Sequence, residues 1–372
     1  MKVMTVVGTR PEIIRLSRVI ARLEQADALE HVLVHTGQNY DHSLNQVFFD
    51  DLGLRPPDHY LDVDTSSLGN VLGGVLVASE RVIAQERPDA LLVLGDTNSC
   101  ISAVMAKRMR VPVYHMEAGN RCFDENVPEE TNRRLVDHVA DFNLAYTEHA
   151  RRNLLAEGLH PRRVIVTGSP MREVLDHYRA HIDASDVLSR LELEQGAYFL
   201  VSAHREENVD APDRLRMLVD CLTRVHERWG LPVVVSTHPR TRKRLVELNA
   251  SIEGDVRWLE PFGFHDYNRL QMSAACVLSD SGTISEESAI LGFPAVTLRD
   301  SIERPEALDA GTIVMTGLDA EDVERAVGVV MTSESTRSSM PAGYEVTDTS
   351  IRVVRFILST AGRHHTWAGI RP

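Results

Sequence analysis

The strongest constraint on the fold is a recurring alternation between short apolar runs and helix-length segments. The runs are rich in β-branched residues and form two sets, at residues 3–8, 31–37, 90–96, 111–117, 141–146 and 163–169, and at 198–204, 232–238, 256–261, 276–282, 294–300 and 312–317. Strands that are apolar on both faces are typical of parallel sheets covered by helices on both sides. The pattern therefore predicts an α/β protein with two doubly wound, Rossmann-like domains.

A polar, helical connector at residues 169–197 separates the two sets of runs. A chain of 372 residues is also too long for one ordinary core. We therefore expect an N-terminal domain at residues 1–172 and a C-terminal domain at residues 173–348. The final helical segment, 349–372, is expected to pack back on the N-terminal domain.

The composition is that of an ordinary globular protein, with 43% hydrophobic and 25% charged residues. A formal net charge of −14 argues against broad binding to nucleic acids or to membrane surfaces. No apolar run approaches membrane-spanning length, and the N-terminus enters a strand at once instead of resembling a signal peptide. The four cysteines form no CxxC pair, which is typical of reduced thiols, so we expect a cytoplasmic protein.

Polar residues follow many of the apolar runs, at the points where the predicted strands end. In an open parallel sheet, ligands bind beyond the carboxyl ends of the strands. A ligand held in a cleft between the two domains could therefore contact residues from both sheets. The residues expected at these edges are Gly8-Thr9-Arg10, Gly37-Gln38, Asp96-Thr97, Glu117, His204-Arg205, His238, Asp280-Ser281-Gly282 and Arg299-Asp300.

The segment GTRPEIIR, residues 8–15, follows the first predicted strand. Thr9 and Glu12 have the spacing of a capping box at the start of a helix. A helix N-terminus favours anions, and Arg10 and Arg15 would add positive charge there. The segment is neither a GxGxxG fingerprint nor a Walker P-loop. A capped helix with two solvated arginines is an equally good explanation of this motif taken alone.

The segment SDSGTISEE, residues 279–287, likewise follows a predicted strand and can begin a helix, here in the second domain. Thr283 and Glu286 can form a capping box, while backbone N–H groups near Ser281 can face a phosphate. Glu287, one turn into the helix, could accept hydrogen bonds from a ribose diol, and Arg304 downstream is a possible phosphate or ribose partner. The alternatives are a capped surface helix and a surface salt bridge.

The segment 115–134, HMEAGNRCFDENVPEETNRR, gathers carboxylates and arginines directly after a predicted strand. It can be a solvated loop, a metal site or a set of catalytic acids and bases. We expect no metal, because no known ligand spacing is present and the arginines would repel a cation. Glu117 ends its strand at the predicted ligand edge, where acid–base chemistry would use it. Asp96, by contrast, can simply cap the next helix.

The other charged residues of this segment are assigned either to catalysis or to a solvated loop. Glu129 is expected to begin a helix that carries Arg133 on the same face, four residues on. Asp124, Glu125 and Arg134 are expected to stay solvated. In the second domain, His204 is a candidate proton carrier or phosphate donor, although a lone histidine is more often structural.

Eight motifs together resemble the non-hydrolysing UDP-N-acetylglucosamine 2-epimerases, in order and nearly end to end. They are VVGTRPEIIR, LGDTNS, HMEAGNR, VPEETNRR, VTGSP, AHREEN, SDSGTISEE and RDSIERPEA. The resemblance implies a fold of the glycosyltransferase-B type, a UDP-sugar bound in a cleft, a homodimer, and no metal or NAD cofactor. It also implies that UDP is eliminated to give a 2-acetamidoglucal and is then added back after reprotonation of C2 from the opposite face.

The resemblance also assigns residues to roles. The catalytic positions of the family fall on Asp96, Glu117, Glu129, His204, Arg15 and Arg133. Its substrate-binding positions fall on Arg10, Tyr267, Ser281, Gly282, Thr283, Glu287 and Arg304.

Three positions depart from the usual family pattern. Arg15 replaces a lysine, which keeps the charge but removes an amine able to transfer a proton. Thr283 replaces the second glycine of the phosphate loop and restricts the backbone there. Glu206 replaces an arginine, and this charge reversal removes the basis for expecting activation by UDP-GlcNAc.

The sequence therefore predicts a UDP-N-acetylhexosamine 2-epimerase of the UDP-GlcNAc/UDP-ManNAc type that supplies precursors for surface polysaccharide. Four local motifs, HTGQNYD, AGNRCFD, GFHDYN and SGTISEES, look closer to the branch that makes UDP-N-acetyl-L-fucosamine, so a 6-deoxy-L-hexosamine is the alternative substrate. A glycosyltransferase of the same fold and a UDP-sugar-binding regulator are alternatives of other classes, because fold does not fix function.

Overall fold

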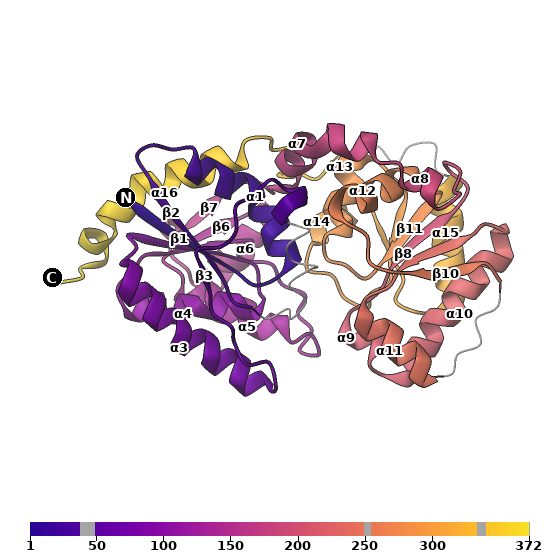
Figure 1. Cartoon of the computed structure of the whole chain (residues 1–372), viewed down its shortest axis with the longest axis horizontal. Coiled ribbons are helices and arrows are strands. Elements are labelled where there is room, and N and C mark those ends of the chain that lie inside the picture. The colour runs from indigo at the N-terminus through magenta and orange to yellow at the C-terminus, as the bar shows by residue number, and fades with distance from the viewer. Residues whose placement is uncertain (38–48, 249–253, 333–339, 372) are drawn as a thin grey trace. The chain divides into compact units, whose positions relative to one another are not determined.

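The computed structural model describes residues 1–37, 49–248, 254–332 and 340–371 (Figure 1). The chain divides into two compact units, each described here by itself. The N-terminal unit comprises Met1–His177 together with Ala342–Pro372, and the C-terminal unit comprises Tyr178–Pro341. The first boundary lies a few residues beyond the one expected at 172.

The N-terminal unit contains a parallel sheet with the strand order β3-β2-β1-β4-β5-β6-β7. Strand order reverses between β1 and β4, which makes this the topological switch point. β3 has only two residues and no apolar run, which is why the sequence pattern did not predict it. The strands are β1 Lys2–Val7, β2 Glu30–His35, β3 His59–Tyr60, β4 Ala90–Leu94, β5 Val113–Met116, β6 Phe142–Ala145 and β7 Val164–Val166.

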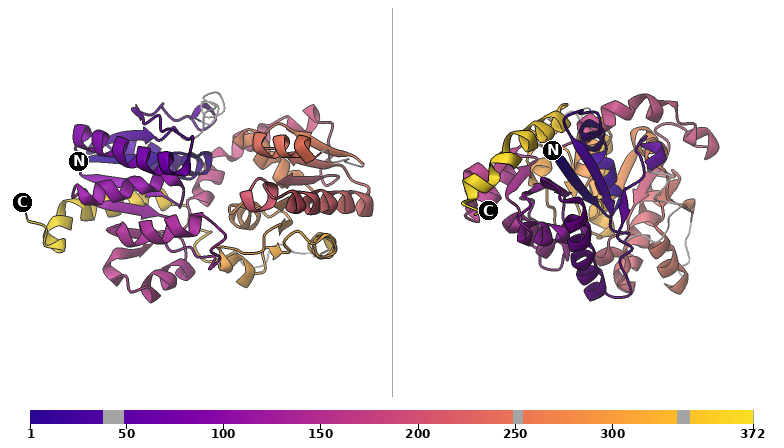
Figure 2. Two further views of the ribbon diagram at one scale, coloured as in Figure 1. Left: turned by 90° about the horizontal axis from the view of Figure 1, so that it is seen from below. Right: turned by 60° about the vertical axis from the view of Figure 1, so that its left-hand side comes forward.

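Helices cover this sheet, as Figure 2 shows. In α1, Ile13, Leu16, Ile20 and Leu23 recur at helical spacing and are fully buried, which explains how the helix docks. α3 packs against α4, and α4 packs against α5. The helices are α1 Arg10–Glu24, α3 Leu68–Glu86, α4 Ser102–Arg108, α5 Glu129–Val139, α6 Glu148–Ala156 and α7 Met171–Ala184, with the short η1 Asn98–Ile101 and η2 Pro161–Arg163.

The last helix, α16 (Thr349–Ala368, yellow in Figure 1), packs against α1 of the N-terminal unit. The buried hydroxyl groups of Thr360 and Tyr114 in β5 lie 2.6 Å apart. At the start of the helix, the N–H of Ser350 donates to Glu173 of α7 at 2.8 Å. One polar contact near the middle of α16 and one at its start therefore help to fix how the helix lies on the unit.

The C-terminal unit contains a second parallel sheet, with the order β10-β9-β8-β11-β12-β13 and a switch point between β8 and β11. The predicted class of two doubly wound α/β domains is confirmed. Its strands are β8 Phe199–Ser202, β9 Val233–Ser236, β10 Val256–Leu259, β11 Cys276–Ser279, β12 Ala295–Thr297 and β13 Val314–Met315. Its helices are α8 Val187–Arg190, α9 Glu206–Val209, α10 Pro212–Trp229, α11 Pro239–Leu248, α12 Phe264–Ser273, α13 Ile284–Leu291, α14 Pro305–Asp309 and α15 Ala320–Thr332.

Two absences hold for the part of the chain that the structure describes. No helix there is long and apolar enough to cross a membrane. None of the four cysteines, Cys100, Cys122, Cys221 and Cys276, forms a disulfide.

Gly119 shows how closely α6 approaches the loop after β5. Its backbone is left-handed, with φ of +86°, and a Cβ added there would lie 2.3 Å from the carbonyl oxygen of Ala150. Gly158 has a similar φ of +88°, but no atom lies within 4 Å of its added Cβ. Comparing alanine substitutions at Gly119 and Gly158 therefore separates the cost of a left-handed backbone from the cost of a steric collision.

We expect Gly119→Ala to destabilise the protein far more than Gly158→Ala. The left-handed backbone alone costs roughly 1–2 kcal/mol for alanine, whereas the collision with Ala150 should bring the Gly119→Ala loss above about 4 kcal/mol. Urea denaturation of both variants measures the difference. Equal losses would mean that the loop and α6 do not pack as described.

Candidate active site

The two loops at the switch point of the N-terminal sheet are joined by the buried carboxyl group of Glu12. Its Oε2 accepts hydrogen bonds from the backbone N–H of Gly8 at 3.0 Å and from the hydroxyl of Thr9 at 2.8 Å. Its Oε1 accepts from the hydroxyl of Ser99, which follows β4. Burial raises the pKa of Glu12 to about 7.

This arrangement corrects the predicted capping box of Thr9 and Glu12. Thr9 occupies the N-cap of α1, but its hydroxyl donates to Glu12 instead of accepting from an N–H of the helix. The carboxylate reaches the N–H of Gly8, one residue before the N-cap. Glu12 therefore connects the β1 loop to the β4 loop, in addition to supporting the start of the helix.

Glu117 leaves β5 in a left-handed backbone conformation, with φ of +63°. For a residue with a side chain this conformation costs roughly 1–2 kcal/mol. Its carboxylate pairs through Oε2 with Nη1 of Arg15 in α1, and both side chains are almost fully buried. The side-chain amide of Asn120 lies 3.5 Å from Oε1 of Glu117. Two predicted catalytic residues, Arg15 and Glu117, are therefore in direct contact.

Asp96 lies near the same edge, one residue after Gly95. A Cβ added to Gly95, whose φ is +76°, would lie 3.7 Å from Oε2 of Glu117, so the loops after β4 and β5 approach each other closely. The Nε of Arg133 in α5 donates to Oδ2 of Asp96 at 3.1 Å. Asn132 donates to the backbone carbonyl of Asp96 at 3.0 Å. Asp96 is thus paired with an arginine. It does not cap the next helix, because η1 begins without a side-chain cap.

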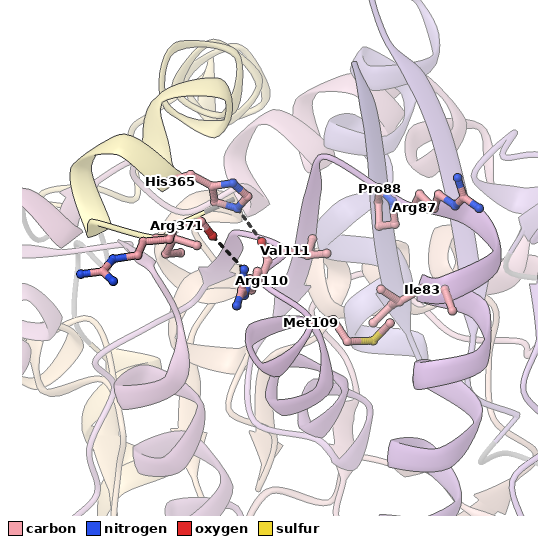
Figure 3. A pocket seen from close by; sticks show the side chains of 10 residues that line it. Ile83, Arg87, Pro88, Met109, Arg110, Val111, His365 and Arg371 are labelled. Atoms are coloured by element: carbon pink, nitrogen blue, oxygen red, sulfur yellow. Dashed lines mark hydrogen bonds between the residues drawn. The ribbon is translucent and has the colours of Figure 1, made fainter.

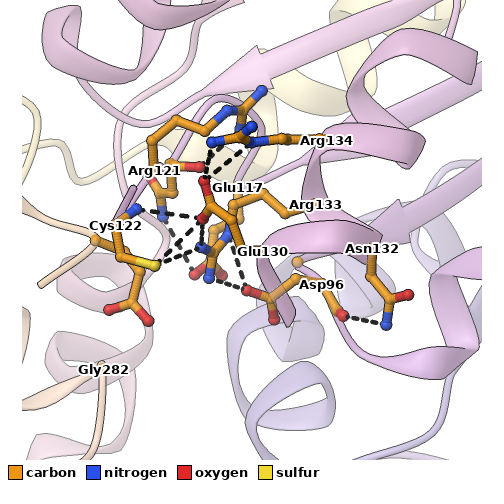
Figure 4. A network of polar contacts seen from close by, with 12 residues as sticks. Asp96, Glu117, Arg121, Cys122, Glu130, Asn132, Arg133, Arg134 and Gly282 are labelled. Atoms are coloured by element: carbon orange, nitrogen blue, oxygen red, sulfur yellow. Dashed lines mark hydrogen bonds and ion pairs between the residues drawn. The ribbon is translucent and has the colours of Figure 1, made fainter. Parts of the chain in front are cut away.

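Figure 4 shows that Arg133 contacts a second carboxylate, Glu130, as well as Asp96. Glu130 is buried and also accepts from the backbone N–H of Cys122 at 3.2 Å and from Nε of Arg134 at 3.1 Å. Glu130 therefore holds α5 against the loop after β5. The sequence analysis did not single it out, because its neighbour Glu129 matched the family motif.

The remaining predicted residues of this unit lie at helix starts. Arg10 is the first residue of α1, where burial lowers the pKa of its guanidinium. Glu129 is the first residue of α5 and is half-buried. Glu125 is exposed as expected, whereas Arg134 pairs with Glu130. Gln38, expected at the same edge, lies outside the described residues.

In the C-terminal unit, the buried Asp280 organises the loop after β8. Its carboxylate accepts from the backbone N–H groups of His204 and Arg205, each at 3.0 Å, and from the side chain of Asn208 at 3.1 Å. The ring Nδ1 of His204 lies 3.5 Å from the same carboxylate, and its side chain is 45% exposed. His204 is therefore held by its backbone while its ring stays accessible.

The loop Ser281-Gly282-Thr283 follows β11 at the switch point of this sheet. The hydroxyls of Ser281 and Thr283 lie 2.9 Å apart. Arg304 donates to the carbonyl of Gly282, and its Nε lies 3.3 Å from Oε2 of the buried Glu286. The predicted capping box of Thr283 and Glu286 is wrong, because Glu286 binds Arg304 and Thr283 forms no side-chain cap on α13.

Tyr267 and Glu287 lie together on the other side of this loop. Burial and the nearby carboxylate of Glu287 raise the pKa of the Tyr267 hydroxyl. The Oε2 of Glu287 accepts from Nε2 of Gln271 at 2.6 Å, which orients the carboxylate. The second unit thus brings Tyr267 close to Glu287 and Arg304 close to Gly282.

Glu206, at the position of the charge reversal, faces Arg240. The Nη1 of Arg240 donates to Oε1 of Glu206 at 2.6 Å, and its Nε donates to Asp210 at 3.0 Å. The acidic residue is therefore neutralised by a nearby arginine of α11.

A pocket of about 430 Å³ lies elsewhere on the N-terminal unit (Figure 3). Its lining includes Pro88 and Val111, which precede β4 and β5, and His365 of α16. It therefore lies at the amino ends of the strands, away from the loops that carry Asp96 and Glu117. Within the described residues, no group of three or more His, Cys, Asp or Glu side chains is placed to hold a metal ion.

Comparison with known proteins identifies the family. The model of the family described as UDP-N-acetylglucosamine 2-epimerase matches residues 21–358. The chain belongs to the UDP-N-acetylglucosamine 2-epimerase family. Epimerases are isomerases, so the predicted enzyme class is confirmed.

Two solved members of this epimerase family are similar to the chain over nearly its whole length. The UDP-N-acetylglucosamine 2-epimerase of Rickettsia bellii is 43% identical, with 98% of each chain covered and a TM-score of 0.91. The UDP-GlcNAc 2-epimerase of Methanocaldococcus jannaschii, solved in complex with UDP-GlcNAc and UDP, is 33% identical, with 96% of this chain and 100% of that chain covered and a TM-score of 0.91.

A curated relative acts on a different sugar. The UDP-2,3-diacetamido-2,3-dideoxy-D-glucuronate 2-epimerase of Pseudomonas aeruginosa is 35% identical over 320 residues, which cover 85% of this chain and 88% of the relative. Substrate identity therefore varies among relatives at a similar degree of identity.

Several polar residues of this epimerase's site were missed by sequence reasoning. Glu12 had been treated only as a helix cap, and Glu130 only as part of a charged run. No local signal identifies Glu130, whose burial depends on the loop that folds over it. No local signal identifies the burial of Glu12 either, because it depends on Ser99 of the loop after β4.

Glu12 should make the stability of this epimerase depend on pH. A carboxyl whose pKa is raised by folding stabilises the folded state fully only below its ordinary pKa, and this contribution is lost as pH rises toward the folded value of about 7. Relative to Glu12→Gln, the wild-type free energy of unfolding should fall by roughly 2–3 kcal/mol between pH 5 and pH 8. Urea denaturation at several pH values measures this.

Glu80→Gln is the matched control, because Glu80 is exposed on α3. It should keep the wild-type dependence on pH. If Glu12→Gln also keeps that dependence, Glu12 does not ionise within this range in the folded protein.

Proposed function

We propose that this epimerase inverts C2 of a UDP-N-acetylhexosamine, with UDP-GlcNAc and UDP-ManNAc as the substrate pair. UDP is eliminated from C1 and C2 to give a 2-acetamidoglucal, and it is added back after C2 is reprotonated on the opposite face. The observation that carries the proposal is the pair of carboxylate–arginine contacts at the edge of the N-terminal sheet, Glu117 with Arg15 and Asp96 with Arg133. The solved relative with UDP-GlcNAc and UDP supports the choice of substrate.

The chemistry needs carboxylates and arginines together. No carbonyl group acidifies the proton on C2, so a positioned base has to remove it while UDP leaves. A second group has to return a proton from the other face. Asp96, Glu117 and Glu129 are the proposed acids and bases of this reaction, and Arg15 and Arg133 keep two of these carboxylates oriented. The leaving diphosphate gains charge, which nearby cations stabilise.

The C-terminal unit is proposed to bind UDP. The hydroxyls of Ser281 and Thr283 and the guanidinium of Arg304 suit a diphosphate. Tyr267 and Glu287 suit the uridine, because a carboxylate fixed by Gln271 can accept hydrogen bonds from a ribose diol. His204 would add a donor to the phosphates, and Arg10 of the N-terminal unit stays a predicted substrate-binding residue. No cofactor is required for this reaction.

The finer predictions extend this proposal. A homodimer, a cytoplasmic location and a role in surface polysaccharide synthesis are proposed with it, and the unpaired cysteines support a reducing compartment. The alternative substrate is the 6-deoxy-L-hexosamine of the UDP-N-acetyl-L-fucosamine branch. The Pseudomonas aeruginosa relative, which is named for a modified sugar, supports testing more than one hexosamine.

Exchange of the C2 proton tests the proposal directly. Incubation of the enzyme with UDP-GlcNAc in deuterated water should place deuterium at C2 and produce UDP-ManNAc, as NMR would show. The same assay with the 6-deoxy-L-hexosamine nucleotide tests the alternative. Acceptor-dependent release of UDP without deuterium at C2 would instead indicate a glycosyltransferase, and tight binding without exchange a regulator.

Glu117→Gln should lower kcat by about 10²–10⁴-fold, because the amide cannot transfer the proton. UDP should still bind with unchanged affinity, as isothermal titration calorimetry would measure. Glu125→Gln is the control, since Glu125 is an exposed glutamate of the same loop, and it should leave kcat unchanged. A Glu117→Gln enzyme with wild-type turnover would exclude Glu117 as an acid or base.

Arg304→Lys should weaken the binding of UDP about tenfold, or about 1.4 kcal/mol. The guanidinium donates to the carbonyl of Gly282 while pairing with Glu286, and an ammonium group cannot reproduce this planar arrangement. Arg325→Lys on α15 is the control, because that side chain is 72% exposed. Equal UDP affinity in both variants would remove Arg304 from the binding site.

A further inference from the structure

A fully buried histidine, His115, lies behind the carboxylates of the N-terminal site. It is a residue of β5, two positions before Glu117, and its side chain has no exposed surface. Its Nε2 lies 2.6 Å from the backbone carbonyl oxygen of Gly95, and its Nδ1 lies 2.9 Å from Oδ1 of Asp137 in α5. Both ring nitrogens therefore face oxygen atoms.

The Gly95 carbonyl can only accept a hydrogen bond, so Nε2 of His115 has to carry a proton. Asp137 is surrounded by donors: the N–H of Gly119 lies 3.1 Å from Oδ2 and 3.3 Å from Oδ1, and Nη1 of Arg121 lies 2.7 Å from Oδ2. With donors at both of its oxygens, Asp137 serves as a hydrogen-bond acceptor. Asp137 then has no proton to give, and Nδ1 of His115 has to donate as well.

The surrounding charges balance a protonated ring. Arg121 pairs with Glu157 through two hydrogen bonds of 2.8 and 2.7 Å, and these hydrogen bonds lower the pKa of Glu157. The Nε2 of His138, which is partly exposed, lies 3.1 Å from Oε2 of Glu157, the oxygen that Nη2 of Arg121 also contacts. The buried cations His115 and Arg121 thus face the carboxylates Asp137 and Glu157, so the ring is not an uncompensated charge.

This network connects the three segments that carry the proposed acids and bases. The Gly95 carbonyl immediately precedes Asp96, and the N–H of Gly95 donates to Met116, which precedes Glu117. Asp137 belongs to α5, which begins at Glu129 and carries Arg133. A single imidazolium therefore holds the β4 turn, the β5 turn and α5 in one arrangement.

We propose that His115 is a positioning residue that donates from both ring N–H groups and so holds the Asp96 and Glu117 turns against α5. The inference deepens the proposed function, because the turns it holds carry the proposed acids and bases. His115 acts through these residues and makes no contact with the sugar. Asp137 maintains the charge of the ring.

NMR of the full-length enzyme labelled with ¹⁵N-histidine tests the protonation state without depending on activity. Both ring nitrogens of His115, identified by the loss of their signals in His115→Asn, should carry a proton at pH 7.5. In Asp137→Asn, only one ring nitrogen should carry a proton at the same pH. A singly protonated His115 at pH 7.5 in the wild-type enzyme would overturn the proposal.

Turnover tests the positioning role. Asp137→Asn keeps the shape of the network, and Arg121 keeps its pair with Glu157, so the variant should lose stability but remain folded. It should bind UDP with wild-type affinity, while kcat falls about 10–100-fold, as for removal of other supporting groups. A merely structural defect would lower UDP affinity together with kcat.

His138→Asn on the same helix is the matched control, because it removes a histidine from the exposed end of the network. Its kcat should stay within about twofold of the wild-type value. Wild-type kcat in Asp137→Asn would also overturn the proposal. If no hexosamine is epimerised by the wild type, the proposed function fails, while the NMR result still decides the charge of His115.

Discussion

The parallel pairing of β1 with β4 is the interaction on which the N-terminal site depends. It reverses the strand order, so the loops that follow these two strands diverge and leave polar groups at the carboxyl edge of the sheet. One loop leads into α1 with Arg15, and the other carries Asp96. Glu12 then crosses from the first loop to Ser99 of the second. The backbone hydrogen bonds between β1 and β4 therefore determine where the charged side chains of the site can come into contact.

Burial gives these charged groups their properties. Arg15 with Glu117, Arg133 with Glu130, and Arg121 with Asp137 are pairs with little exposed surface. Removing one member of such a pair removes a counter-charge that water cannot replace, which is unfavourable. The pairs therefore act as a rigid set, and preorganised charges of this kind are what a reaction with a departing diphosphate needs.

The fold was largely predictable, because apolar runs at strand length report burial on both faces without reference to distant residues. For the candidate site, the sequence indicates which residues to examine but not how they pair. Arg15 and Glu117 are far apart in the sequence and meet only because β1 and β5 share a sheet. The capping boxes at Thr9 and Thr283 failed for the same reason, since groups from other elements competed for the glutamates. Local spacing identifies a possible hydrogen-bond partner, but it does not show which partner the side chain binds in the folded protein.

The left-handed backbone at Glu117 has a consequence for protein engineering. Glycine tolerates this conformation without penalty, and asparagine tolerates it better than glutamate does. Either substitution would relieve a backbone cost of roughly 1–2 kcal/mol. It would also remove the carboxylate that the buried Arg15 contacts, and breaking such a pair costs about 3–5 kcal/mol. The ion pair therefore outweighs the backbone cost, and an engineer who relaxes this turn should expect a less stable protein.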